Sequence, residues 1–280
     1  MKPKQIIGMG LAFGLMFMLS SQWAGAQSRC VEKELSFQSG EEIDYVITYN
    51  WFLVWTDVGK VKFEVRDTTM YERNLYQLIG TGTTFSFYDW FFQVYDVYQS
   101  WIDPETFRPV YYHRDVDEDG YLMDIKYWYN HTQNEVYSRV QKRSKPAYRD
   151  TLSLPNCTFD VMSVIYYARN IDFENYDIDQ KIPLKIVLDN ELTDVYLRYK
   201  GKEVRKVRGV GRFKTLKFTG SLIAGDVFQG GEDLVIWVSD DENRIPLWIE
   251  APIIVGKIKA RLVGYKGLKY PLSSLIESFE

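Results

Sequence analysis

Residues 42–53 read EIDYVITYNWFL, and every second side chain in this stretch is apolar. The apolar set is Ile43, Tyr45, Ile47, Tyr49, Trp51 and Leu53, and the positions between them include Glu42, Asp44, Thr48 and Asn50. A period of two is that of a β-strand, in which successive side chains point to opposite faces. The stretch therefore predicts a strand with one dry face and one wet face.

The same alternation recurs along the chain, at residues 59–65, 121–129, 182–188 and 256–262. The first of these runs follows a turn that we place at residues 57–59. Half-buried alternation between short connections favours antiparallel pairing. We therefore predict an all-β, mainly antiparallel fold in which a single large curved sheet forms a half-open or closed β-barrel.

One segment has helical spacing instead. Val161, Val164, Ile165 and Ala168 follow each other at i, i+3, i+4 and i+7, and Asp160 suits a first helical turn. We expect a helix of about 11 residues between 158 and 170, capped by Thr158 and packed across the sheet. The pattern does not decide whether residues 83–93 form a short helix or an aromatic loop.

Composition and charge narrow the function classes. Apolar residues make up 46% and charged residues 26% of the 280 residues, which excludes disorder. The net charge of -4 argues against a nucleic-acid partner, since such domains are strongly basic. Two histidines and two incomplete glycine motifs, at 80–82 and 209–211, provide little for a metal, a cofactor or histidine-dependent catalysis. We expect no cofactor and no metal, and enzymatic activity stays open but disfavoured.

The N-terminus has the parts of a secretory signal peptide: a basic start, an apolar run at 6–19 and a small-residue ending at Ala24 and Ala26. We predict a signal peptide at 1–26, a single β-rich domain at 27–280 and export to the periplasm or outer membrane. A retained membrane anchor is the alternative. In an oxidising compartment Cys30 and Cys157 are expected to form a disulfide, the alternative being two separate buried thiols.

Aromatic residues concentrate in two stretches, 51–55 and 85–92. They are expected either to fill the core or to line a pocket for an apolar ligand. The candidate pocket residues are Trp51, Leu53, Trp55, Phe85, Phe87, Trp90 and Phe91.

Three charged stretches each allow two interpretations. The basic run 200–217 is a candidate contact for an anionic surface through Arg205, Lys206, Arg208 and Arg212, or a protected sheet edge. Asp240, Asp241 and Glu242 are candidate carboxylates of a hydrolase, or an ordinary turn between strands. Asp115, Asp117 and Asp119 start like a calcium loop, but Asp119-Gly120 is also a hairpin turn, which we favour.

Three stretches taken together, 39–59, 158–170 and 235–256, resemble an exported bacterial family known as domain-of-unknown-function family 3108. The placement of Cys30 and Cys157 is similar to that of Bacteroides-type members. The resemblance implies an exported β-rich protein in the cell envelope, and it implies no catalytic residues.

The leading hypothesis is a non-catalytic envelope protein that binds an apolar or amphipathic, lipid-like ligand on the concave side of the sheet. A hydrolase acting on envelope glycans through paired carboxylates, and a structural or interaction protein of the envelope, are the alternatives. We expect a monomer whose partners include a lipid, an envelope protein or an anionic membrane surface.

Overall fold

The computed structural model describes residues 29–51, 54–88, 90, 92–143, 145–222, 231–253 and 256–279. These ranges contain one sheet of sixteen strands, one α-helix and two short 3-10 helices. The predicted signal peptide lies outside them. No helix in the described part of the chain has the length and apolar character that a membrane crossing requires.

The strands fall into two series. The first consists of β1 (Glu42–Trp51), β2 (Val54–Met70), β3 (Arg73–Thr84), β4 (Val94–Ile102), β5 (Pro109–Glu118), β6 (Tyr121–Asn130), β7 (Glu135–Lys142) and β8 (Tyr148–Ser153). The second consists of β9 (Thr158–Phe159), β10 (Lys181–Leu188), β11 (Glu191–Val207), β12 (Gly211–Leu222), β13 (Gly231–Ser239), β14 (Pro246–Pro252), β15 (Lys257–Lys266) and β16 (Leu275–Ser278). The helical elements are η1 (Ser86–Tyr88), α1 (Val161–Ala168) and η2 (Phe173–Asn175).

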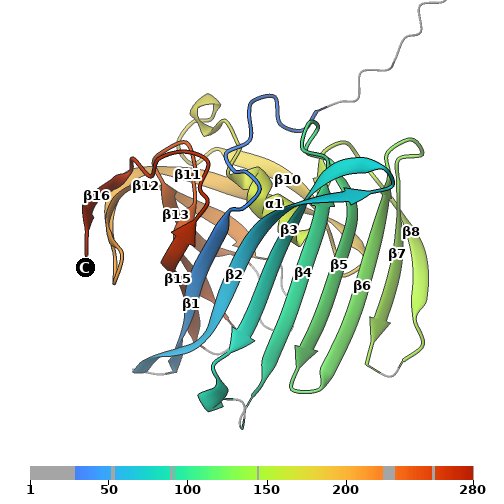
Figure 1. Cartoon of the computed structure of the whole chain (residues 1–280), viewed down its shortest axis with the longest axis horizontal. Coiled ribbons are helices and arrows are strands. Elements are labelled where there is room, and N and C mark those ends of the chain that lie inside the picture. Colours follow the sequence, from blue (N-terminus) through green and yellow to red (C-terminus); the bar gives the residue numbers. More distant parts are fainter. Residues whose placement is uncertain are drawn as a thin grey trace, which may run out of the picture.

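Within each series, strands that follow each other in sequence are neighbours in the sheet, except for β16. The strand β1 joins the two series by pairing with both β2 and β15, and β8 and β9 are the two ends. The pairs are antiparallel except for β9 with β10, and β16 pairs with β12 beside the main path. The sheet curves strongly so that its two ends approach each other without closing (Figure 1). The predicted curved antiparallel sheet is thus confirmed, and it is open.

Side chains of the β10–β11 turn bridge the gap between the two ends of the sheet. Asp189 accepts a 3.1 Å hydrogen bond from Arg114 of β5, and Asn190 donates a 3.1 Å bond to Asp150 of β8. Both contacts are exposed polar contacts, so they hold the ends near each other without continuing the backbone ladder.

The helix α1 lies on the concave face near the upper end of the sheet (Figure 1). Its N-cap is Asp160, whose carboxylate accepts the backbone N–H groups of Met162 (3.0 Å) and Ser163 (2.8 Å). The prediction that Thr158 caps the helix is wrong, because Thr158 belongs to β9 and donates its hydroxyl to the carbonyl of Pro155 (2.8 Å). The buried Asp160 carboxylate satisfies two N–H groups that the first turn leaves unpaired.

Two further local predictions meet different outcomes. The turn expected at 57–59 is wrong: these residues continue β2, and the register with β1 shifts there between Ile47 and Thr48. The extra residue forms a bulge, which interrupts the alternation that the sequence showed. The hairpin turn at Asp119-Gly120 is confirmed, with φ values of 49° and 78°.

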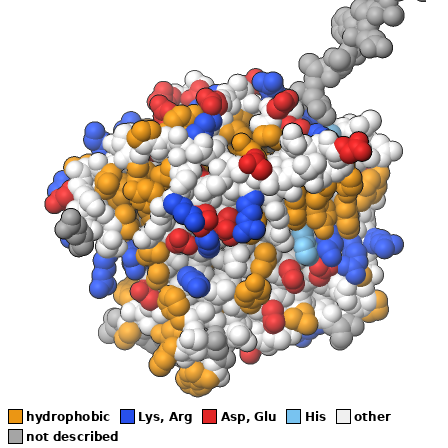
Figure 2. Space-filling model, viewed as in Figure 1, with side chains coloured by type: hydrophobic (Ala, Val, Ile, Leu, Met, Phe, Trp, Pro, Cys, Tyr) orange, Lys and Arg blue, Asp and Glu red, His pale blue; other side chains and the backbone are white. Residues whose placement is uncertain are grey.

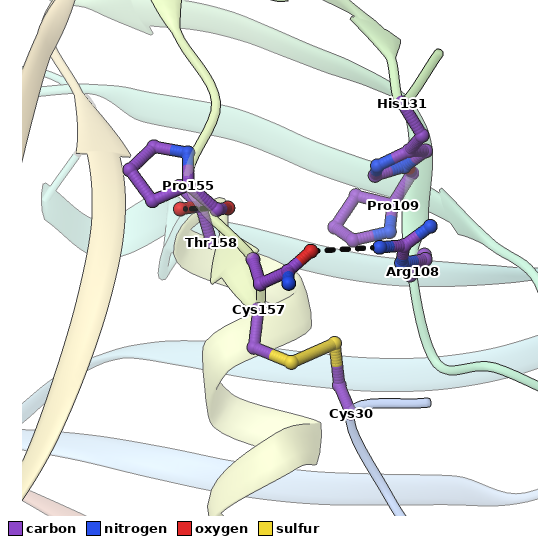
Figure 3. The surroundings of a disulfide bond; sticks show 8 residues. Cys30, Arg108, Pro109, His131, Pro155, Cys157 and Thr158 are labelled. Atoms are coloured by element: carbon purple, nitrogen blue, oxygen red, sulfur yellow. Dashed lines mark hydrogen bonds between the residues drawn. A yellow bond between two sulfur atoms is a disulfide. The ribbon is translucent and has the colours of Figure 1, made fainter. Parts of the chain in front are cut away.

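A disulfide joins Cys30 to Cys157, whose Cα atoms are 5.4 Å apart and which are separated by 127 positions in the sequence (Figure 3). Beside it, Arg108 donates a 2.9 Å hydrogen bond to the Asn156 side chain, and Cys30 donates its backbone N–H to Thr106. The bond ties the segment before β1 to the chain that enters α1. In the segment between Cys30 and β1, Phe37 packs against Tyr166 of the helix, with ring centroids 4.8 Å apart.

Candidate ligand-binding interior

The face of the sheet that carries α1 is the inner face. Gly80 of β3 identifies it, because a Cβ atom there would lie 2.8 Å from Sδ of Met162 on the helix. Directly paired residues of an antiparallel sheet share one face. The register therefore assigns the remaining strands: Gly80 pairs with Tyr98, and Tyr98 pairs with Arg114.

Beyond the helix, the inner face carries a continuous apolar row across four strands. Ile236 of β13 pairs with Ile249 of β14, which pairs with Ala260 of β15, which pairs with Ile47 of β1. One step further from the helix, Ile258 pairs with Tyr49. We call these residues the inner apolar wall: Ile47, Tyr49, Ile236, Ile249, Ile258 and Ala260.

Every member of the inner apolar wall is half-buried. By contrast, Tyr45 and Leu262, which point the same way but lie closer to the helix end, are 1% and 0% exposed. Burial on the inner face thus decreases along β1 and β15, because Tyr45 and Leu262 pack in an apolar cluster with Phe213 and Leu247 that includes neither Ile47 nor Tyr49. The lower part presents aliphatic side chains that neighbouring elements leave partly uncovered.

A polar cluster lies on the same inner face, on β4 and β5. Asp96 pairs with the buried Val116 and with Gly82, and Gly82 pairs with Val61 next to the inner apolar wall. The guanidinium of Arg114 stands 5.1 Å from the ring centroid of Tyr98. We call Asp96, Tyr98, Arg114 and Glu118 the inner polar cluster.

Burial changes the acidity of this cluster. Desolvation and then the charge of the neighbouring Glu118 raise the pKa of Asp96 to about 7, against an opposing effect of Arg114. Desolvation likewise raises the pKa of Tyr98 to about 12. Oδ1 of Asp96 and Nε of Arg114 are buried and have no hydrogen-bond partner within the protein. Buried polar atoms are nearly always paired, so these two atoms are exceptions within the described part of the chain.

The structure describes the side chains of four of the seven candidate pocket residues, and it does not bring these four together on the concave wall. Trp55 lies on the outer face opposite Asn50, and Phe87 and Trp90 are 74% and 80% exposed after β3. Phe85 is half-buried and donates its backbone N–H to Val58. Leu53, Phe91 and the side chain of Trp51 lie outside the described residues. The described members form part of the lower rim of the sheet instead of its concave wall.

The four candidate basic residues differ in their burial and contacts. Arg205 is enclosed between the rings of Trp237 and Trp248, at 3.6 and 4.6 Å from their centroids, and pairs with Glu250 at 3.1 Å. Since β11 and β14 are separated by two strands in the sheet, this contact requires the β11–β12 hairpin to bend over the outer face. Lys206, Arg208 and Arg212 are exposed, with Lys206 over the Phe279 ring and Arg212 near Glu277 at 3.7 Å.

The acidic turn between β13 and β14 has structural contacts. Asp241 accepts hydrogen bonds from Ser239 and from the backbone N–H groups of Asn243 and Ser274, and Asp240 pairs with Lys202 at 3.0 Å. These carboxylates hold the C-terminal segment on the turn. The pair of carboxyl groups on the inner face is Asp96 and Glu118, which the sequence did not indicate, because β4 mixes polar and apolar residues on both faces.

Two surface clefts lie at the upper end, away from the inner apolar wall. One is lined by Thr68, Asn74 and Pro104, and the other by the segment 29–37 with Glu105 and Lys269. Neither contains a residue of the predicted aromatic pocket.

Comparison with known proteins supports the fold and the family. Among solved structures, a β-barrel-like protein of the domain-of-unknown-function family DUF1849 from Brucella abortus is similar, with a TM-score of 0.53 and 7% identity over 82% of this chain and 98% of that chain. At this identity the similarity concerns the fold alone. No curated protein matches the sequence. The model of the family described as "Protein of unknown function (DUF3108)" matches residues 44–263, so the chain belongs to that family.

Proposed function

We propose that the protein is a non-catalytic binding protein whose ligand is amphipathic, with an aliphatic chain on the inner apolar wall and a polar end at the inner polar cluster. The observation that supports this most directly is the incomplete burial of six apolar side chains on the concave face. Aliphatic surface left open on a concave face gains free energy when a ligand covers it, at roughly 25 cal/mol per Å².

The inner polar cluster supports a ligand with a hydrogen-bonding end. Oδ1 of Asp96 accepts a hydrogen bond when it is ionised, and Nε of Arg114 donates one, so a hydroxyl or amide group satisfies both types of atom. A ligand group that pairs with one of these atoms removes the penalty of a buried unpaired polar atom, about 1–3 kcal/mol for each.

The predicted signal peptide and the disulfide support a location outside the cytoplasm, in the periplasm or at the outer membrane. Disulfides persist in oxidising compartments, and Cys30 and Cys157 are the two cysteines of the sequence. A ligand-binding protein in this location meets envelope lipids and their breakdown products.

The test is binding of the fluorescent fatty acid 11-(dansylamino)undecanoic acid to the full chain, measured by the blue shift of its emission. Ala260→Trp fills the concave side at the centre of the inner apolar wall. The matched control is Val46→Trp on β1, which lies on the outer face opposite Arg261. We expect Ala260→Trp to weaken binding at least about tenfold and Val46→Trp to leave it unchanged.

Equal probe affinity in the two variants, or no binding by the unaltered protein, would contradict the proposal. Circular dichroism and the urea midpoint of each variant establish that both remain folded. Native mass spectrometry after incubation with a lipid extract then identifies the mass of the natural ligand.

A glycan hydrolase is the second candidate, and the observation that favours it is Asp96 beside Glu118 with a pKa of about 7 for Asp96. A carboxyl group with this pKa is suited to donate a proton near neutral pH. Release of reducing ends from envelope glycans that disappears in Asp96→Asn would support it. No release by the unaltered protein would remove it.

A further inference from the structure

Large apolar side chains are exposed together at the lower end of the sheet. The exposed fractions are 66% for Val54, 74% for Phe87 and 80% for Trp90, and Trp55 beside them is 43% exposed. Hydrophobic side chains gather at this end in Figure 2. Single exposed apolar residues are normal on a protein surface, but a group on adjoining loops marks an interaction site. We call Val54, Trp55, Phe87 and Trp90 the apolar corner.

Hydrogen bonds hold the two parts of the apolar corner together. The Thr56 hydroxyl on β2 and the Tyr88 hydroxyl on η1 are 2.8 Å apart, and Phe85 donates its backbone N–H to Val58 of β2 at 2.9 Å. The start of β2 and the loop after β3 therefore form one unit, and both lie at the lower end of the molecule (Figure 1). The side chains project from strand ends and loops, so they do not form a flat face.

Cationic side chains border the apolar corner on β15. Nζ of Lys259 lies 3.6 Å from the centroid of the Trp55 ring. Lys257 of β15 is exposed and is paired with Asn50 of β1. On the other edge of β1, Asn50 is paired with Trp55 of β2. A tryptophan with lysines beside it matches the boundary of an anionic bilayer, where the ring enters the interface and the ammonium groups meet lipid phosphates.

The apolar corner is continuous with the inner apolar wall. Tyr49, the wall residue of β1 furthest from the helix, pairs with Thr56, which is two residues from Val54.

We propose that the apolar corner docks the lower end of the sheet on the surface of an anionic lipid bilayer. The corner inserts its projecting side chains between head groups, and Lys257 and Lys259 bind lipid phosphates. A lipid surface accommodates separate projecting rings, whereas a protein partner would require a matching pocket for each of them. This docking proposal goes beyond the ligand-binding function and depends only on the exposed side chains of the apolar corner. Either proposal can therefore be contradicted while the other holds.

The experiment measures partition of the full chain onto vesicles of phosphatidylcholine with about one third phosphatidylglycerol, by sedimentation and by quenching of tryptophan fluorescence with brominated acyl chains. The test variant is Phe87→Ser with Trp90→Ser. The matched control is Tyr71→Ser, since Tyr71 is 68% exposed in the β2–β3 turn at the opposite end. We expect the double variant to lower the partition coefficient at least about tenfold and Tyr71→Ser to leave it unchanged.

Replacing Lys257 and Lys259 by Gln is expected to reduce binding to anionic vesicles and to leave the weaker binding to phosphatidylcholine alone unaltered. Equal partition of the double variant and the unaltered protein would overturn the docking proposal. A dimer that forms without vesicles and is lost in the double variant would also overturn it, in favour of a second copy as the occupant. Binding of the dansyl fatty acid, measured without vesicles in the same double variant, reports separately on the interior.

Discussion

Arg169, directly after α1, forms a two-pronged ion pair with Glu41, directly before β1, with Nη1–Oε1 and Nη2–Oε2 distances of 2.6 and 2.9 Å. The side chains are 3% and 0% exposed. Arg169 also donates to the carbonyl groups of Asn243 (3.0 Å) and Ser36 (3.4 Å). One guanidinium thus joins the helix, the N-terminal segment, the start of β1 and the β13–β14 turn.

Replacing Glu41 by Gln is expected to lower the free energy of unfolding by about 3–5 kcal/mol, because it leaves a buried guanidinium without a counter-charge. Urea unfolding followed by circular dichroism measures the change. The double variant Glu41→Leu with Arg169→Met removes both charges and should lose less than the single variant. A single variant within about 0.5 kcal/mol of the unaltered protein would contradict the buried geometry.

Reduction of the Cys30–Cys157 bond is expected to lower the free energy of unfolding by roughly 4–5 kcal/mol, because the closed loop restricts the unfolded chain. The measurement compares urea unfolding with and without reductant. Cys30→Ser with Cys157→Ser is the control that must reproduce the reduced protein and must be indifferent to reductant. A reductant effect that persists in this variant would show that the bond is not its source.

The Asp96 carboxyl should titrate near pH 7, since burial and then the Glu118 charge raise its pKa to about 7 from its ordinary 3.8. The native state therefore holds this proton more tightly than the unfolded chain does. The contribution of this proton to the free energy of unfolding is fully present below pH 3.8 and is lost as the pH rises towards 7. Carbon NMR of the carboxyl resonance measures the titration. Glu118→Gln should lower this pKa part of the way, and an unchanged pKa would exclude Glu118 as a cause.

Arg205→Ala should destabilise the protein by about 1–2 kcal/mol, because it removes the cation from between Trp237 and Trp248 together with its ion pair with Glu250. Thermal unfolding measures the loss. The neighbouring Arg208→Ala is the control and should lie within about 0.5 kcal/mol of the unaltered protein, since only its backbone carbonyl has a described contact, with Arg261. Equal effects of the two changes would mean that the basic run 200–217 affects stability only through its net charge.

The amphipathic strands were predictable because their signal is local. Apolar and polar side chains alternate from Ile43 to Trp51 because only one face of the strand is turned away from water, and β1 includes that range. Asp119-Gly120 marks its hairpin in the same local way, through positive φ angles. The sequence also placed a helix near 158–170, although its cap was assigned two residues early.

The amphipathic strands, the helix and the two cysteines available for pairing could be read from the amino-acid sequence, because these features follow from residue type and short-range spacing. Tertiary structure decided which aromatic residues are inside. Trp55 changes face because a bulge in β2 shifts the alternation by one residue, and no local pattern encodes which strand carries the extra residue. The curvature of the sheet likewise brings Asp96, Arg114 and the inner apolar wall to one concave side, and curvature arises from all sixteen strands together.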